Sequence, residues 1–201
     1  MKILDNINHT VREDLQDTMQ KGSRVSIAAA CFSIYAYQEL KKQLEEIAEL
    51  RFIFTSPTFV QENTPKERRE FYIPKLTREK SLYGTEFEVR LRNELTQKAL
   101  AKECADWVRR KVKFRSNVSG EQMPGFMTVG ESSYMPISGF TTVDLGCERG
   151  NNAYYPVQRT EAFENGRYFL SLFDEIWNDS SRLQDVTDIV LQSISTAYRE
   201  N

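Results

Sequence analysis

The sequence predicts an α/β fold in which a mixed, mostly parallel sheet is flanked by helices on both faces. Two apolar runs, Arg24–Phe32 and Leu50–Thr55, contain the small and β-branched residues typical of buried strands. Between them, the apolar residues of segment 35–48 recur on one face of a helix. A strand, a helix and a second strand joined by short connections form a βαβ unit, whose strands pair in parallel through a right-handed crossover.

The length and composition fit a globular chain. It has 201 residues, of which 40% are hydrophobic and 28% are charged, and this composition excludes the disordered and collagen-like classes. No apolar run approaches the roughly 20 residues that span a bilayer. The N-terminus lacks the apolar core of a signal peptide. We therefore expect a cytoplasmic protein that has no membrane partner.

Periodicity and turn signals predict the remaining elements. Helices are expected over residues 10–20, 95–109 (with Asn93 as the cap), 166–177 and 183–199. Strands are expected around residues 86–91, 109–115, 126–129 and 140–143. Because the apolar stripe of the last helix is still running where the chain stops, we expect residues 1–180 to form a domain. Residues 181–201 are then a helical linker that leads toward another domain.

The cysteines and the single histidine restrict the possible chemistry. Cys31, Cys104 and Cys147 are far apart and form no C-x-x-C pair, so we interpret them as small buried hydrophobes. His9 precedes the first expected helix and is interpreted as a surface or capping residue. One histidine excludes an H-E-x-x-H zinc site and a His-pair phosphodiesterase in a monomer. The chain has no G-x-x-x-x-G-K-[ST] loop, so we expect no NTPase activity of its own.

Charge is distributed unevenly along the chain. The net charge is −2, yet residues 66–115 hold 15 Lys/Arg against 8 Asp/Glu, whereas residues 160–201 hold 3 against 8. The basic middle contains two candidate groups for phosphate contact. The first group is Lys66, Arg68, Arg69, Lys75, Arg78 and Lys80, interleaved with Phe71 and Tyr72 as possible stacking residues. The second group is Arg109, Arg110, Lys111, Lys113 and Arg115. The alternative interpretation is that both groups are ordinary solvated surface.

Three strings resemble one half of a phospholipase D-like domain. The run Ser26–Ser33, followed by a helix and by Leu50–Phe54, is similar to the opening of that family. Ser138–Gly146 resembles its S-N-[FL]-T-x-x-G-L-G segment, and Phe173–Asp179 resembles its closing F-x-x-[IL]-W helix. In particular, the chain resembles the module at the N-terminus of bacterial superfamily II (DEAD/DEAH-type) helicases. This resemblance implies a motor domain beyond residue 201 that holds ATP and Mg²⁺, and no cofactor within these 201 residues.

The resemblance also implies a degenerate catalytic site. Active members carry H-x-K-x-x-x-x-D, in which His attacks phosphorus and Lys binds the phosphate oxygens. When Phe126 marks the strand, Gln122 takes the place of His, Pro124 that of Lys and Val129 that of Asp, and Gly139 stands where Asn is expected. The former-site positions are Gln122, Pro124, Val129, Ser138, Gly139 and Thr141. We expect no catalytic residue here, because Gln cannot attack phosphorus and Pro carries no charge.

These observations favour a non-catalytic nucleic-acid-binding or docking module of a helicase-type protein. Its expected partners are DNA or RNA and its own C-terminal helicase domain. Two alternatives stay open. Glu86-x-Glu88-x-Arg90 is similar to the D…E-x-K pattern of metal-dependent nucleases, but Arg stands in place of Lys and the upstream Asp is missing. The other interpretation of this motif is an edge strand with outward charges. The other alternative is a structural homodimerisation domain, because phospholipase D-like halves often pair through the former active-site face.

Overall fold

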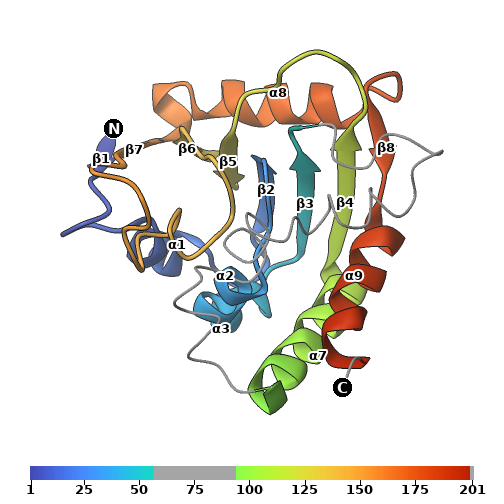
Figure 1. Ribbon diagram of the computed structural model, residues 1–201. Helices are drawn as coiled ribbons and strands as arrows, with labels where there is room; N and C mark the ends of the chain where they lie inside the picture. Colours follow the sequence, from blue (N-terminus) through green and yellow to red (C-terminus); the bar gives the residue numbers. More distant parts are fainter. Residues whose placement is uncertain (57–93, 200–201) are drawn as a thin grey trace.

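The computed structural model describes the backbone of residues 1–56 and 94–199 and the side chains of residues 1–56 and 97–195. Within these ranges the strands form one eight-stranded sheet in the order β1-β7-β6-β5-β2-β3-β4-β8 (Figure 1). The strands are β1 (Lys2–Leu4), β2 (Arg24–Ala29), β3 (Glu49–Phe54), β4 (Val112–Asn117), β5 (Phe126–Val129), β6 (Ser132–Met135), β7 (Val157–Thr160) and β8 (Leu183–Asp185). The mixed α/β class is therefore confirmed.

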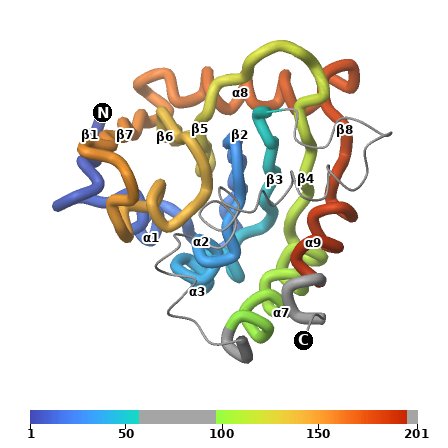
Figure 2. The backbone as a smooth tube through the Cα atoms, viewed as in Figure 1, coloured from blue at the N-terminus to red at the C-terminus, as the bar shows by residue number. Residues whose placement is uncertain are grey.

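The helices frame this sheet. They are α1 (Val11–Thr18), α2 (Ile34–Glu39), α3 (Lys41–Leu44), α7 (Glu94–Lys111), α8 (Gly166–Trp177) and α9 (Thr187–Arg199), and a 3₁₀ turn, η1 (Ala162–Glu164), precedes α8. The hydroxyl of Thr10 caps α1 by accepting the backbone N–H of Glu13 at 3.1 Å. Figures 1 and 2 show α7 and α9 side by side below β4, whereas α8 crosses the other ends of the strands.

The expectation of a mostly parallel sheet is wrong for the described strands. Only β2–β3 and β3–β4 pair in parallel, and the other five neighbouring pairs are antiparallel. The βαβ unit was predicted correctly, but the strands that follow β4 are joined differently. β5 and β6, for example, form a hairpin whose two-residue turn contains Gly130 at φ +59°. A connection this short can join only antiparallel strands.

Alternate residues of the central strands enter two separate hydrophobic clusters. The large cluster contains Ile27 of β2 and Phe52 of β3, together with side chains from α1, α2, α7 and α9. The small cluster contains Ala28 and Ile53, the next residues along those strands, together with Phe173 and other apolar residues of α8. Because successive side chains of a strand point to opposite sides, one strand supplies both clusters.

Within the segment 181–201, expected as a linker, the described residues of β8 and α9 contribute to the same sheet and core. In β8, Leu183 pairs with Asn117 of β4, so this strand lies at the sheet edge. In α9, Val190 and Ile194 are buried in the large cluster, against α7. Part of the expected last helix is therefore strand. The motor domain expected beyond residue 201 stays a prediction.

The other expected elements agree with the structure to different degrees. The helices expected over 10–20, 95–109 and 166–177 correspond to α1, α7 and α8, and the strand around 126–129 corresponds to β5. The single helix over 35–48 is instead two short helices separated at Leu40. No strand forms over 140–143, where an isolated bridge between Phe32 and Phe140 is followed by turns. The strand expected at 86–91 and the Asn93 cap lie outside the described residues.

The cysteines and His9 are placed individually. Cys104 is buried as expected, but the interpretation of Cys147 as buried is wrong because it is exposed, and Cys31 is intermediate. His9 is exposed, as predicted, and the adjacent Thr10 provides the helix cap. Across the described part of the chain, no helix combines the length and the apolar character that crossing a membrane requires.

Candidate functional site at the carboxyl edge of the sheet

The carboxyl ends of β2, β3 and β4 meet at one end of the sheet, and β5 begins there because it runs antiparallel to β2. Residues 138–141 join this end. The backbone N–H of Ala30 donates to the carbonyl of Ser138, and that of Phe140 donates to the carbonyl of Cys31, both at 2.9 Å. We call this region the carboxyl edge. Ligands of open α/β sheets commonly bind beyond the carboxyl ends of the strands.

The structure brings most of the former-site positions to the carboxyl edge. Gln122 and Pro124 precede β5 and are exposed. Ser138 is exposed beside the end of β2, and the next former-site positions along that segment are buried. Val129 is the exception, because it pairs with Val25 at the opposite end of β2. Val129 therefore lies apart from the other former-site positions.

The space around Gly139 is filled. A Cβ atom added at Gly139 would lie 2.5 Å from the Cys31 Sγ and 2.9 Å from the Asp144 Oδ2. A side chain as large as Asn therefore does not fit here unless its neighbours move. Gly125 is even more tightly enclosed, since its added Cβ would lie 1.9 Å from the carbonyl oxygen of Ile137. The carboxyl edge is packed close around its two glycines.

Asp144 is the carboxylate of this edge, and both of its oxygens are occupied. Its Oδ2 accepts the backbone N–H and the hydroxyl of Thr141 at 3.1 and 2.6 Å. Its Oδ1 accepts the hydroxyl of Tyr155 at 2.6 Å, and the Tyr155 oxygen in turn accepts the backbone N–H of Ser138 at 2.9 Å. Burial and the neighbouring Asp144 carboxylate raise the pKa of Tyr155, which therefore keeps its proton. The Asp144 carboxylate therefore holds the turn that begins at Thr141 in place.

Sequence reasoning missed Asp144 and Tyr155, although one signal was available. The spacing Thr141-x-x-Asp144 matches the [ST]-x-x-[DE] pattern in which a hydroxyl and a carboxylate bond reciprocally across one turn. The hydrogen bond from the Asp144 N–H to the Thr141 hydroxyl at 3.3 Å completes that pattern. Tyr155 has no comparable local signal, because its contact with the segment depends on the fold.

A buried amide shapes the loop that carries Gln122 and Pro124. The Asn117 Nδ2 donates to the carbonyls of Thr55 and Glu121, both at 2.8 Å. Its Oδ1 accepts the backbone N–H of Ser119 at 2.8 Å. One side chain at the end of β4 thereby ties β3 to the loop, since it uses both halves of its amide.

The second basic group is divided among several partners. Arg109 pairs with Asp106 at 2.9 Å on the exposed surface of α7, and Arg110 pairs with Glu45 at 2.7 Å. The hydrogen bond to Glu45 raises the pKa of Arg110. The Lys111 ammonium donates to the backbone carbonyls of Glu45 and Ile47 at 2.5 and 2.7 Å. Arg110 and Lys111 therefore already have protein partners.

The two basic residues of β4 differ from each other. Arg115 stacks on the Trp177 ring, with its guanidinium carbon 4.1 Å from the ring centroid, and donates to the Trp177 carbonyl. Lys113 is exposed, and no ion pair to it is present among residues 1–56 and 97–195. The first basic group and the Glu86-x-Glu88-x-Arg90 motif lie outside the described residues.

The described side chains contain no group of three His, Cys, Asp or Glu residues arranged to hold a metal ion. No protein-family model matches this chain, and no curated protein matches its sequence. The functional assignment therefore depends on the geometry of the carboxyl edge and, separately, on the charges of α7 and β4.

Proposed function

We propose that this chain is a non-catalytic, phospholipase D-like module of a helicase-type protein, with helices on both faces of its sheet, that binds DNA or RNA through phosphate contacts. The observation that carries the proposal is the packing of the carboxyl edge. Cys31 and Asp144 occupy the space around Gly139, where the resembled family has Asn.

The side chains at this edge support binding in preference to catalysis. Phosphoryl transfer by the resembled family needs a nucleophile and a cation that binds the phosphate oxygens. Gln122 and Pro124 supply neither, and both oxygens of Asp144 accept hydrogen bonds from Thr141 and Tyr155. A carboxylate held in this way stabilises the turn. It would have to give up those hydrogen bonds before it could accept a proton from a substrate.

The charge around α7 and β4 supports nucleic acid as the ligand. Residues 94–115 hold 7 Lys/Arg against 3 Asp/Glu. Arg110, Lys111 and Arg115 are held by groups of other elements, whereas Arg109 pairs with the exposed Asp106 of its own helix. Lys113 and Arg109 are therefore the strongest candidates for phosphate contact. Phosphate contacts of this kind bind without sequence preference and weaken as salt rises, because counterions are released.

The test is a salt titration of binding to fluorescein-labelled single- and double-stranded DNA, followed by anisotropy. The slope of log K against log salt should become shallower by about 1 for each phosphate contact removed by Lys113→Ala or Arg109→Ala. Arg149→Ala is the matched control, since Arg149 is exposed in the loop beside Asn6 and Ile7, at the β1 end of the sheet and far from β4. Equal losses in all three variants would contradict a localised interface.

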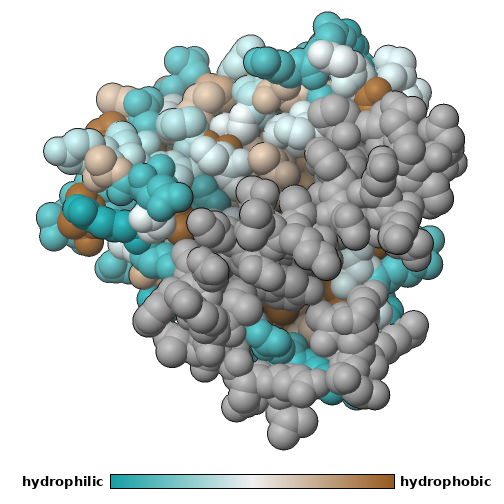
Figure 3. Space-filling model, viewed as in Figure 1, coloured by the Kyte–Doolittle hydropathy of each residue, from teal (hydrophilic) through white to brown (hydrophobic). Residues whose placement is uncertain are grey.

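Apolar side chains beside α8 favour a second candidate, a docking or homodimerisation domain. Met123, Met135, Leu172 and Ile176 pack on the small cluster but are only partly buried. In Figure 3 apolar residues appear among hydrophilic ones along the upper side, where Figure 1 places α8. If this surface pairs two copies, light scattering should give a dimer mass, and Leu172→Glu should reduce it to the monomer mass.

A further inference from the structure

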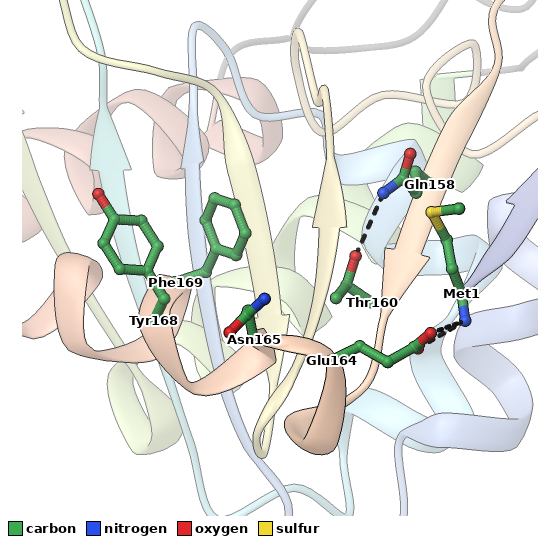
Figure 4. Close-up of a pocket in the computed structure, with 7 residues that line it drawn as sticks. All are labelled: Met1, Gln158, Thr160, Glu164, Asn165, Tyr168 and Phe169. Carbon is green, nitrogen blue, oxygen red and sulfur yellow. Dashed lines mark hydrogen bonds and ion pairs between the residues drawn. The ribbon is translucent and has the colours of Figure 1, made fainter.

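A hollow of about 560 Å³ lies at the β1–β7 end of the sheet, away from the second basic group (Figure 4). Gln158 and Thr160 of β7 line one side of it, and Tyr168 and Phe169 of α8 line the other. Met1, Glu164 and Asn165 complete the lining. Its volume lies within the range of about 300–1,000 Å³ that is usual for small-molecule sites.

The aromatic side of the hollow is held in place by α8. Gly166 lets this helix start directly against the β5–β6 turn, since a Cβ at Gly166 would lie 2.2 Å from the Glu131 carbonyl oxygen. The Phe169 ring packs on Phe126 of β5 with their centroids 5.8 Å apart. Tyr168 meets Phe169 edge-on at 5.2 Å and is 61% exposed. Figure 4 shows both rings standing beside Asn165 and across from the β7 side chains.

The polar side of the hollow is rich in neutral groups. The Gln158 amide donates to the Thr160 hydroxyl at 3.5 Å, which leaves its amide oxygen as an acceptor. Asn165 has φ +82°, and among the described residues its side-chain amide makes no hydrogen bond. Glu164 is paired with the Met1 ammonium group, which lowers the pKa of Glu164. The lining thus has no unpaired cation to attract a phosphate or a carboxylate.

We infer that this hollow binds a neutral nucleobase, as a free nucleoside or as the base of a single strand. Aromatic rings stack on bases of any sequence. Amides such as those of Gln158 and Asn165 present a donor and an acceptor side by side, which matches the edges of bases and of adenine in particular. The single-strand source rests on the proposed function, whereas the nucleoside source does not depend on it.

The test is a titration of the ¹⁵N-labelled chain with adenosine, cytidine and uridine, with glucose as a neutral ligand that cannot stack between rings. Nucleosides should shift the side-chain amide resonances of Gln158 and Asn165 in a saturable way that is insensitive to salt. Tyr168→Ala should weaken that binding by about 5-fold or more, as expected for the loss of one stacking contact. Phe163→Ala is the matched control, because Phe163 is 87% exposed next to the hollow and does not line it.

Each outcome bears on the inference. Shifts with glucose equal to those with adenosine, unchanged affinity in Tyr168→Ala, or no saturable shift with any nucleoside would overturn it. An oligonucleotide with one abasic position separates the sources: weaker binding than that of the intact strand assigns the ligand to a strand, and equal binding assigns it to a free nucleoside. The uncharged nucleosides report on the hollow even if phosphate-dependent DNA binding fails, so the two proposals can fail independently.

Discussion

Gly125 lies where the chain enters β5, and its backbone passes directly beside another segment. A Cβ added by Gly125→Ala would lie 1.9 Å from the carbonyl oxygen of Ile137 and 3.5 Å from that of Ala28, so the backbone must shift. We expect the free energy of unfolding to fall by about 1–3 kcal/mol, the usual result of overpacking. Urea denaturation followed by circular dichroism measures this change.

The matched control for Gly125 is Gly120, which lies in the preceding loop. Nothing lies within 4 Å of a Cβ at Gly120, so Gly120→Ala should change the stability by no more than about 0.5 kcal/mol. Similar losses in both variants would show that the close approach at Gly125 does not exist in solution.

Asp14 is a second residue whose environment leads to a testable prediction. Its carboxylate accepts the Tyr134 hydroxyl at 2.7 Å and two bonds from Arg159 at 2.7 and 2.8 Å. Burial alone would raise its pKa, but these hydrogen bonds and one from Lys2 outweigh burial and lower the pKa. A lowered folded-state pKa contributes stability that is present above the unfolded value of about 4 and is lost as the pH falls through the folded value.

Asp14→Asn should therefore lower the free energy of unfolding at pH 7 by about 1–3 kcal/mol, because Arg159 loses charge-assisted hydrogen bonds to a buried carboxylate but keeps its ion pair with Glu161. It should also flatten the decline in stability below about pH 4. Urea midpoints across pH 2 to pH 7 measure both effects. Asp17→Asn, an exposed change on the same helix, is the control. An acid profile of Asp14→Asn that follows the control would refute this assignment.

At this scale, sequence could predict which residues are apolar and buried, but not which polar residues meet. The apolar face of segment 35–48 was recognised from its helical spacing, and its residues Leu40, Leu44 and Ile47 are buried. The pair Asp14–Arg159 joins residues 145 positions apart. No local pattern encodes such a contact, because it forms only when β7 is placed beside β6.

Among the elements, the packing of α9 leads to the clearest prediction about stability. Ile194 is 1% exposed and packs in the large cluster, so Ile194→Ala should cost about 2–5 kcal/mol of stability. The exposed Ser171 of α8 provides the control, since Ser171→Ala should change stability by no more than about 0.5 kcal/mol. Thermal unfolding distinguishes the two variants. Equal melting temperatures would mean that α9 is a linker outside the core.

The sequence predicted the long periodic elements better than the short ones. The helical repeat of residues 166–177 matches α8. By contrast, β1, β6, β7 and β8 have 3 or 4 residues each and were not predicted, because so few residues cannot establish an alternation. The strand expected over 140–143 does not form. Its residues lie instead in turns that the Asp144 carboxylate holds by hydrogen bonds.

For the whole molecule, the basic middle of the sequence overstates the charge available to a ligand. In the sequence, Arg110 and Lys111 belong to one run of basic residues. In the structure, both bind the α3–β3 connection, through Glu45 and Ile47. The segments that carry the former-site positions could be predicted from the sequence, but not that Val129 lies at the opposite end of β2 from the carboxyl edge. The filling of that edge by Cys31 and Asp144 could not be predicted either, since it depends on side-chain packing.

The central claim, a binding module without catalysis, is tested most directly by incubating the chain with end-labelled single- and double-stranded DNA in Mg²⁺. Native and denaturing gels of the same reactions report binding and cleavage together. We expect retarded complexes that dissociate as salt rises, and DNA of unchanged length. Cleavage that persists in highly purified protein and disappears with EDTA would contradict the claim and favour the metal-dependent nuclease.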